Sequence, residues 1–141
     1  IIINFKMSWN IRMDKKYMIP SQIKKESKIP IESWRKYVEN SDLIWAEDSP
    51  IAESYEREGR EWVAKSRLKM NAYFELNKNG YGNLRFKYFD GSLSIDCERQ
   101  TLKRVERMWE VKCYFKGYLF KKGTKFTEKK LEKLREKKNK N

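Results

Sequence analysis

The chain has 141 residues, of which 39% are hydrophobic and 14% aromatic, so it is long enough for one folded domain and too short for two ordinary ones. Its formal net charge is +13, and it contains no histidine, which removes the commonest general base and transition-metal ligand. No apolar stretch approaches the roughly 18 residues of a membrane span. We therefore expect a cytoplasmic protein with no membrane association, no catalytic residue set, no metal and no cofactor.

The predicted domain begins near Met7. Met7 is followed by Ser8 and Trp9 and is typical of a natural start, so residues 1–6 are interpreted as a leader or as added residues. The single domain then covers residues 7–120. Residues 9–14 alternate strictly between apolar and polar, which predicts a strand with Trp9, Ile11 and Met13 facing the core.

Residues 29–42 carry the clearest helix signal in the chain. Their apolar residues fall at helical spacing and form one stripe, while charged residues occupy the other face. Pro30 suits the first turn, and Asn40 begins a plausible stop. A helix with a Trp and a Tyr on its buried side needs a sheet to pack on. The stripe consists of Ile31, Trp34, Tyr37 and Val38.

The middle of the chain predicts an antiparallel meander. Residues 43–46 read as a short strand, residues 47–50 as a turn, and residues 61–65 as the start of stronger strand signals. Residues 71–76 place Tyr73 and Glu75 on the face opposite their apolar neighbours, and residues 84–89 alternate in the same way. Asn79-Gly80 indicates either a tight hairpin or, with Tyr81-Gly82, a longer loop between these strands, and Asp90-Gly91 is a hairpin signal that leads to a strand over 93–95.

The last third predicts two helices and a returning strand. Asp96 is the expected cap of a helix whose apolar stripe runs from Leu102 to Trp109, with basic residues on its outer side (Lys103, Arg104 and Arg107). Residues 111–115 are expected to return as a strand. Thr127 is a good N-cap for a final helix, with Phe126 placed to contact Leu131.

The predicted fold is therefore α+β: an antiparallel meander sheet with two helices on one face and a basic C-terminal helix. Residues 121–141 form this helix and its tail, with ten Lys and Arg against three Glu, and residues 135–141 are expected to fray. Cys97 and Cys113 are far apart in the sequence. They form either one disulfide or, as we expect in a reducing compartment, two buried free thiols.

Residues 7–11 and 29–42 together resemble a group of small bacterial proteins in which an N-terminal strand precedes a helix of the I-S-L-E-E-W-x-x-Y-V type. Residues 91–115 follow that group's order of a glycine-preceded strand, a helix and a returning strand. Members of the group are similar to immunity proteins that accompany secreted bacterial toxins. The resemblance implies a non-catalytic protein that neutralises a cognate toxin by direct contact, and it implies no catalytic residues.

A toxin-binding protein needs a rigid scaffold with a complementary surface, and aromatic and charged side chains dominate such surfaces. Trp45 and Trp62 flank an irregular acidic segment that contains Glu47 and Asp48. These tryptophans are either exposed contact residues or core residues that close the sheet. The candidate partner-binding residues are Trp45, Glu47, Asp48, Trp62, Arg85 and Lys87.

Two other functions are open. Lysine and arginine alternate with aromatic residues in 85–89 and 114–122, so the protein could be a basic nucleic-acid-binding module that uses the sheet and the tail. Strand alternation makes Phe86 and Phe115 better core candidates than base-stacking platforms. An enzyme is the third class, and Glu47 with Asp48 is one pair of carboxylates that could serve acid–base catalysis. Such pairs usually lie in surface loops and have no catalytic role.

Overall fold

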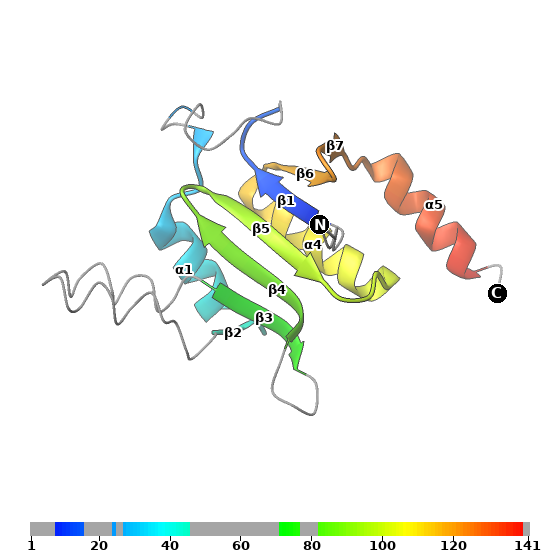
Figure 1. Cartoon of the computed structure of the whole chain (residues 1–141), viewed down its shortest axis with the longest axis horizontal. Helices are drawn as coiled ribbons and strands as arrows, with labels where there is room; N and C mark the ends of the chain where they lie inside the picture. The colour runs from blue at the N-terminus through cyan, green and yellow to red at the C-terminus, as the bar shows by residue number, and fades with distance from the viewer. Residues whose placement is uncertain (1–7, 16–23, 25–26, 46–70, 77–81, 140–141) are drawn as a thin grey trace, which may run out of the picture.

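The structure, a computed structural model, describes residues 8–15, 24, 27–45, 71–76 and 82–139. Within them, seven strands form one antiparallel sheet in the order β2-β3-β4-β5-β1-β6-β7, and three helices accompany it (Figure 1). The predicted α+β class is confirmed. The strands are β1 (Ser8–Arg12), β2 (Ile44–Trp45), β3 (Asn71–Leu76), β4 (Gly82–Phe89), β5 (Ser92–Cys97), β6 (Tyr118–Lys121) and β7 (Thr124–Lys125). The helices are α1 (Ile31–Glu39), α4 (Leu102–Phe115) and α5 (Glu128–Asn139).

The predicted meander holds for β3, β4 and β5, which are neighbours both in sequence and in the sheet. Asp90 and Gly91 form the β4–β5 turn, with φ angles of +46° and +88°, as this tight hairpin requires. The sheet as a whole is not a pure meander, because β1 lies between β5 and β6 and pairs with both. Local sequence signals reveal which strands form hairpins, whereas the position of β1 depends on contacts with distant residues.

One face of the sheet is covered by α1 and α4 (Figure 1). The rows of side chains on this face are apolar, and Trp34 of α1 lies over them, with its ring centroid 6.0 Å from that of Phe86 on β4. The ring centroid of Phe115, on α4, lies 6.3 Å from that of Trp34. The core predicted from alternation is confirmed on β1, β3, β4 and β5. Its fully buried large side chains include Trp9, Ile11, Leu84, Phe86, Leu93, Ile95, Met108, Leu119 and Leu131.

Helix α1 forms as predicted, with Trp34 and Val38 buried. Pro30 is the residue before the first helical residue, and Asn40 ends the helix with its N–H donating to the Lys36 carbonyl oxygen. The segment that leads into α1 is fixed to the β4–β5 hairpin, because the Ile29 N–H donates to the Gly91 carbonyl oxygen at 2.8 Å. The Tyr88 hydroxyl also donates to the Ile29 carbonyl oxygen at 2.6 Å.

Helix α4 differs from its prediction at both ends. Asp96 belongs to β5, and Thr101 is the N-cap, with its side chain accepting from the Arg104 N–H at 3.3 Å. Residues 111–115, expected as a strand, are the last turns of the helix. The helical stripe continues through the buried Val111 and overrides the strand propensity of this run. The helix ends at Lys116 (φ +56°), and the Gly117 N–H donates to the Lys112 carbonyl oxygen.

Helix α5 begins as predicted, since the Thr127 hydroxyl accepts from the Lys130 N–H at 3.4 Å. Phe126 and Leu131 are buried in the common core, so the first turns of α5 pack against the rest of the described residues. The expectation that residues 135 onward fray is wrong as far as Asn139, where the helix ends. Arg135 ties this turn to α4, with its Nε donating to Glu106 at 2.8 Å.

Candidate functional site

The sheet surface opposite α1 and α4 carries a patch built from three cross-strand rows of side chains. In the first row, Ile44 of β2, Tyr73 of β3, Arg85 of β4 and Asp96 of β5 are register partners. The next rows add Lys87, opposite Ser94, and Phe89, opposite Ser92. Because alternate residues of these strands face the core, these six side chains point away from it. We call this set the open patch: Ile44, Tyr73, Arg85, Lys87, Phe89 and Asp96.

The centre of the open patch is a charge triplet. Asp96 accepts ion pairs from the Arg85 guanidinium at 3.2 Å and from the Lys87 ammonium at 2.8 Å. All three side chains are partly exposed, so the pairs contribute little to the free energy of unfolding. They do fix the orientation of the two cations and leave the triplet with a net charge of +1. Such an arrangement favours recognition of a complementary surface more than it favours stability.

Apolar side chains flank this triplet. Phe89 is 59% exposed and Ile44 is 48% exposed, and both belong to the few large hydrophobic side chains of the described residues that face solvent. Tyr73 is partly buried between them. A hydrophobic and aromatic surface that surrounds oriented charges has the composition of a protein–protein contact. The patch therefore combines exposed apolar side chains and charge on one face of the sheet.

The predicted partner-binding residues fall into three groups. Arg85 and Lys87 lie together in the open patch, on one strand. Trp45 lies on the helix-covered face, since it is the register partner of the buried Ala72 and packs edge-on against Trp34 at a centroid distance of 6.4 Å. The structure therefore places Trp45 at the edge of the core and not beside Arg85. The remaining candidates, Glu47, Asp48 and Trp62, lie outside the described residues, as do the predicted 61–65 strand and the Asn79-Gly80 turn.

The sequence prediction did not include Ile44, Tyr73 and Phe89 among the candidate partner-binding residues. The alternation that placed Arg85 and Lys87 on one face also predicts Tyr73 and Phe89 there, so this signal was available. Glu75 was predicted to lie on the same face as Tyr73, and this prediction is wrong. Its backbone has a positive φ of +57°, and its carboxylate lies 3.5 Å from the Arg104 Nε of α4, so it turns toward the helix layer.

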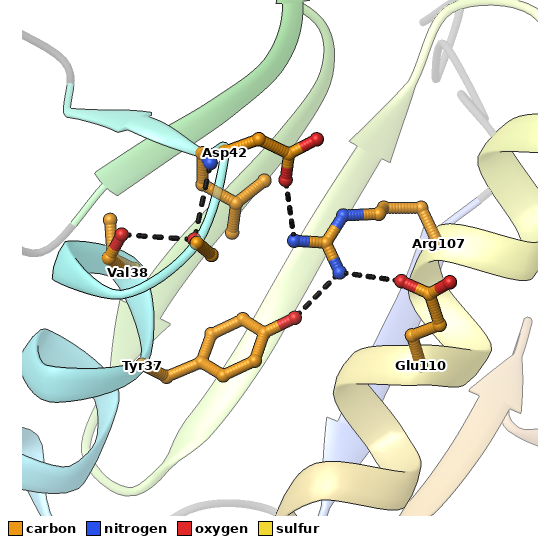
Figure 2. Close-up of polar contacts among 7 residues, drawn as sticks. Tyr37, Val38, Asp42, Arg107 and Glu110 are labelled. Atoms are coloured by element: carbon orange, nitrogen blue, oxygen red, sulfur yellow. Dashed lines mark hydrogen bonds and ion pairs between the residues drawn. The ribbon is translucent and has the colours of Figure 1, made fainter.

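A second polar cluster joins α1 to α4 and is shown in Figure 2. Arg107 of α4 donates to the Tyr37 hydroxyl oxygen at 2.6 Å, to Asp42 at 2.9 Å and to Glu110 at 2.9 Å. Arg107 was predicted on the outer side of its helix, but only 8% of it is exposed. Arg104 is likewise mostly buried rather than outward-facing. We call the four residues Tyr37, Asp42, Arg107 and Glu110 the helix joint.

The polar contacts of the helix joint connect α1 and its C-terminal end to α4. Burial raises the pKa of the Tyr37 hydroxyl, and this outweighs the opposing effect of its hydrogen bond from Arg107. Burial alone would lower the pKa of Arg107, but the hydrogen bond to Tyr37 and the two carboxylates raise it. Tyr37 therefore stays protonated and Arg107 stays charged near neutral pH. The joint holds α1 and the residues that follow it against α4.

Other candidate chemistry is limited in the described part of the chain. Cys97 is a buried free thiol, as predicted, and burial raises its pKa, whereas Cys113 is free but exposed, which corrects the expectation of two buried thiols. Across residues 8–15, 24, 27–45, 71–76 and 82–139, no group of three His, Cys, Asp or Glu side chains is arranged to hold a metal ion. Among the helices of these residues, none has the length and apolar content that crossing a bilayer demands.

None of the known protein-family models matches the chain, and no curated protein or solved structure is detectably similar to it.

Proposed function

We propose that the chain is a non-catalytic binding protein that neutralises a cognate bacterial toxin by direct contact through the open patch. The observation that carries the proposal is the pair of exposed apolar side chains, Phe89 and Ile44, on either side of the Arg85–Lys87–Asp96 triplet. Immobilised apolar anchors with oriented charges are the features that give protein interfaces affinity and specificity.

The scaffold supports this proposal as well. Strands β3, β4 and β5 pair along their length, and the core beneath them is filled by large side chains of α1 and α4. A rigid surface loses little conformational entropy on binding, so more of the contact energy appears as affinity. The choice of a toxin as the partner rests on the resemblance of residues 29–42 to immunity proteins.

The test is a binding titration between the purified chain and the secreted toxin encoded beside its gene. Phe89→Ser should weaken binding at least about 30-fold, because a central anchor residue contributes about 2 kcal/mol or more. Tyr114→Ser is the matched control. Tyr114 is also an exposed aromatic residue, 55% exposed, but it lies on α4 away from the open patch, and its variant should bind normally.

Two results would contradict the proposal. The first is failure of the neighbouring toxin to bind at all. The second is equal weakening by Phe89→Ser and Tyr114→Ser, which would mean that the open patch is not the contact surface. Binding should also survive nuclease treatment of both components, since the proposed contact is between two proteins.

A further inference from the structure

A groove lies between the second half of α4, the β6–β7 hairpin and the start of α5, on the side of the molecule where Figure 1 shows α5. Its volume is about 270 Å³. The side chains that matter for its chemistry are Trp109 and Lys112 of α4, Tyr118 of β6, and Lys125, Phe126 and Glu128 around the start of α5. We call this the basic groove. It is separate from the open patch, which lies on β2 to β5.

The basic groove is surrounded by positive charge without matching negative charge. Residues 112–139 hold eleven Lys and Arg against three Glu, a net charge of +8 out of the +13 of the whole chain. Ion pairs between described residues include none for the five lysines at and beside the groove. These lysines are Lys112, Lys121, Lys122, Lys125 and Lys130.

Four of these lysines, Lys121, Lys122, Lys125 and Lys130, come together around the β6–β7 hairpin and the start of α5. Lys130 donates to the Lys125 carbonyl oxygen at 3.0 Å, which brings α5 over the hairpin. The pKa of Lys121 is lowered, first by its partial burial and then by the nearby ammonium groups of Lys122 and Lys130. Like charges that repel each other in the free protein create a positive potential that attracts a polyanion.

The aromatic rings of the groove are already in contact with ammonium groups. Lys112 Nζ lies 4.3 Å from the ring centroid of Trp109, and Lys125 Nζ lies 4.8 Å from that of Tyr118. The edge of Trp109 also packs against Phe126 at a centroid distance of 6.2 Å. These rings hold the lysines in place, and the face that each ammonium group covers is not open for stacking a base.

We propose that the basic groove binds the phosphate backbone of a nucleic acid without reading its base sequence. Lysine acts on phosphate as a point charge, and several lysines without an ion pair on one surface can each contact a phosphate of a nucleic acid. Protein interfaces are instead depleted of lysine. Association with a membrane surface calls for exposed apolar side chains beside the charge, and the exposed large hydrophobics of the described residues, Ile44, Phe89 and Tyr114, lie on β2, β4 and α4 outside the groove.

The experiment uses the full chain and a fluorescein-labelled 20-nucleotide oligothymidine, with anisotropy measured from 50 to 200 mM KCl. If about four phosphates are contacted, affinity should fall about 50-fold over this range. The triple variant Lys112→Gln, Lys125→Gln and Lys130→Gln should lose at least about tenfold in affinity at 50 mM. The matched control is the triple variant Lys28→Gln, Lys36→Gln and Lys103→Gln. It removes the same charge from the segment before α1, from α1 and from the start of α4.

A further variant changes the charge in the opposite direction. Glu128 is the carboxylate among the described residues that line the groove, so Glu128→Gln should raise the affinity for the oligonucleotide. Unchanged or lower affinity would place the nucleic acid elsewhere and overturn the proposal. Binding at the groove can also be followed in the unmodified protein by NMR, where the indole N–H signal of Trp109 should shift as the oligonucleotide is added. This measurement does not depend on whether the triple variant folds.

Three other outcomes overturn the proposal: no binding at 50 mM KCl, equal loss in the triple variant and its control, and displacement of the oligonucleotide by an equal carboxylate concentration of polyglutamate. The second would show that net charge alone drives binding, and the third that any polyanion suffices. None of them bears on toxin binding by the open patch, because the two tests use different variants on different surfaces.

Discussion

The helix joint and the basic groove use cationic side chains in opposite ways. In the joint, one guanidinium is almost fully buried and meets three acceptors, two of them carboxylates. At and beside the groove, no ion pair joins the ammonium groups of the five lysines to another described residue. Burial of a charge demands partners, whereas exposed charges can remain unpaired because water solvates them. Arg107, which is paired, thus helps to hold the fold together, whereas the lysines of the groove have no ion pair and are available to a ligand.

The largest expected effect comes from breaking the packing that supports the joint. Trp34 is fully buried and contacts the ring of Tyr37 in its own helix and that of Phe86 on β4. Trp34→Ala should lower the free energy of unfolding by about 3–5 kcal/mol, because it leaves a large cavity. Urea denaturation monitored by circular dichroism measures this loss. A loss below about 1 kcal/mol would mean that α1 does not depend on the ring.

Removing the cation of the joint should have a smaller effect. Arg107→Ala should lower the free energy of unfolding by about 1.5–3 kcal/mol, since hydrogen bonds to a charged group are lost and its partners remain half-buried or exposed. Arg107→Met keeps the apolar contacts of the side chain and should lose less. If the two variants were equally destabilised, the charge would matter more than packing in this joint.

Alkaline pH provides a milder perturbation of the same joint. The pKa of Tyr37 is raised above its ordinary value of 10.0. Above that pH the unfolded chain has lost a proton that the folded chain still holds, so the free energy of unfolding falls as pH rises through the raised pKa. Urea titrations at pH 8, 9.5 and 10.5 measure this slope. Tyr37→Phe should make the slope shallower, and an unchanged slope would assign the effect to other groups.

Substitutions in the basic groove should change the free energy of unfolding least. Replacing Lys112, Lys125 and Lys130 together by Gln should change the free energy of unfolding by no more than about 0.5 kcal/mol per site, because the changes are at a partly solvated surface without ion pairs. Relief of repulsion favours a slight gain. Thermal unfolding monitored by circular dichroism checks this. A loss comparable to that of Arg107→Ala would show that these lysines are structural, and the contrast between the two regions would fail.

Much of the fold was predictable because its signals are local. Alternation predicted which side chains of β1, β3 and β4 face the core, and it placed Arg85 and Lys87 on the same face of one strand. Helical spacing predicted α1, and the capping residue Thr127 predicted the start of α5. Each of these features depends on the period or the side-chain chemistry of neighbouring residues.

The remaining features depend on distant contacts. No local period shows that Arg107 is buried, because its acceptors Tyr37 and Asp42 come from another helix and its end. Residues 111–115 have strand-forming side chains, yet they continue α4 because Val111 fills the core. The separate roles of Trp45 and Arg85 likewise emerge only from the pairing of β2 with β3. The open patch was therefore predicted in part, and its apolar anchors were not.

The central place of β1 has a consequence for the order in which the protein is made. Trp9 pairs with Ile95 on one side and with Lys121 on the other, so β1 leaves the ribosome about 110 residues before its last neighbour. At ordinary synthesis rates, this delay is roughly 5–20 s. During most of it, both edges of β1 lack their partners, and pairing with another chain competes with native folding. We expect the yield of folded protein to depend on the rate at which the C-terminal third is translated.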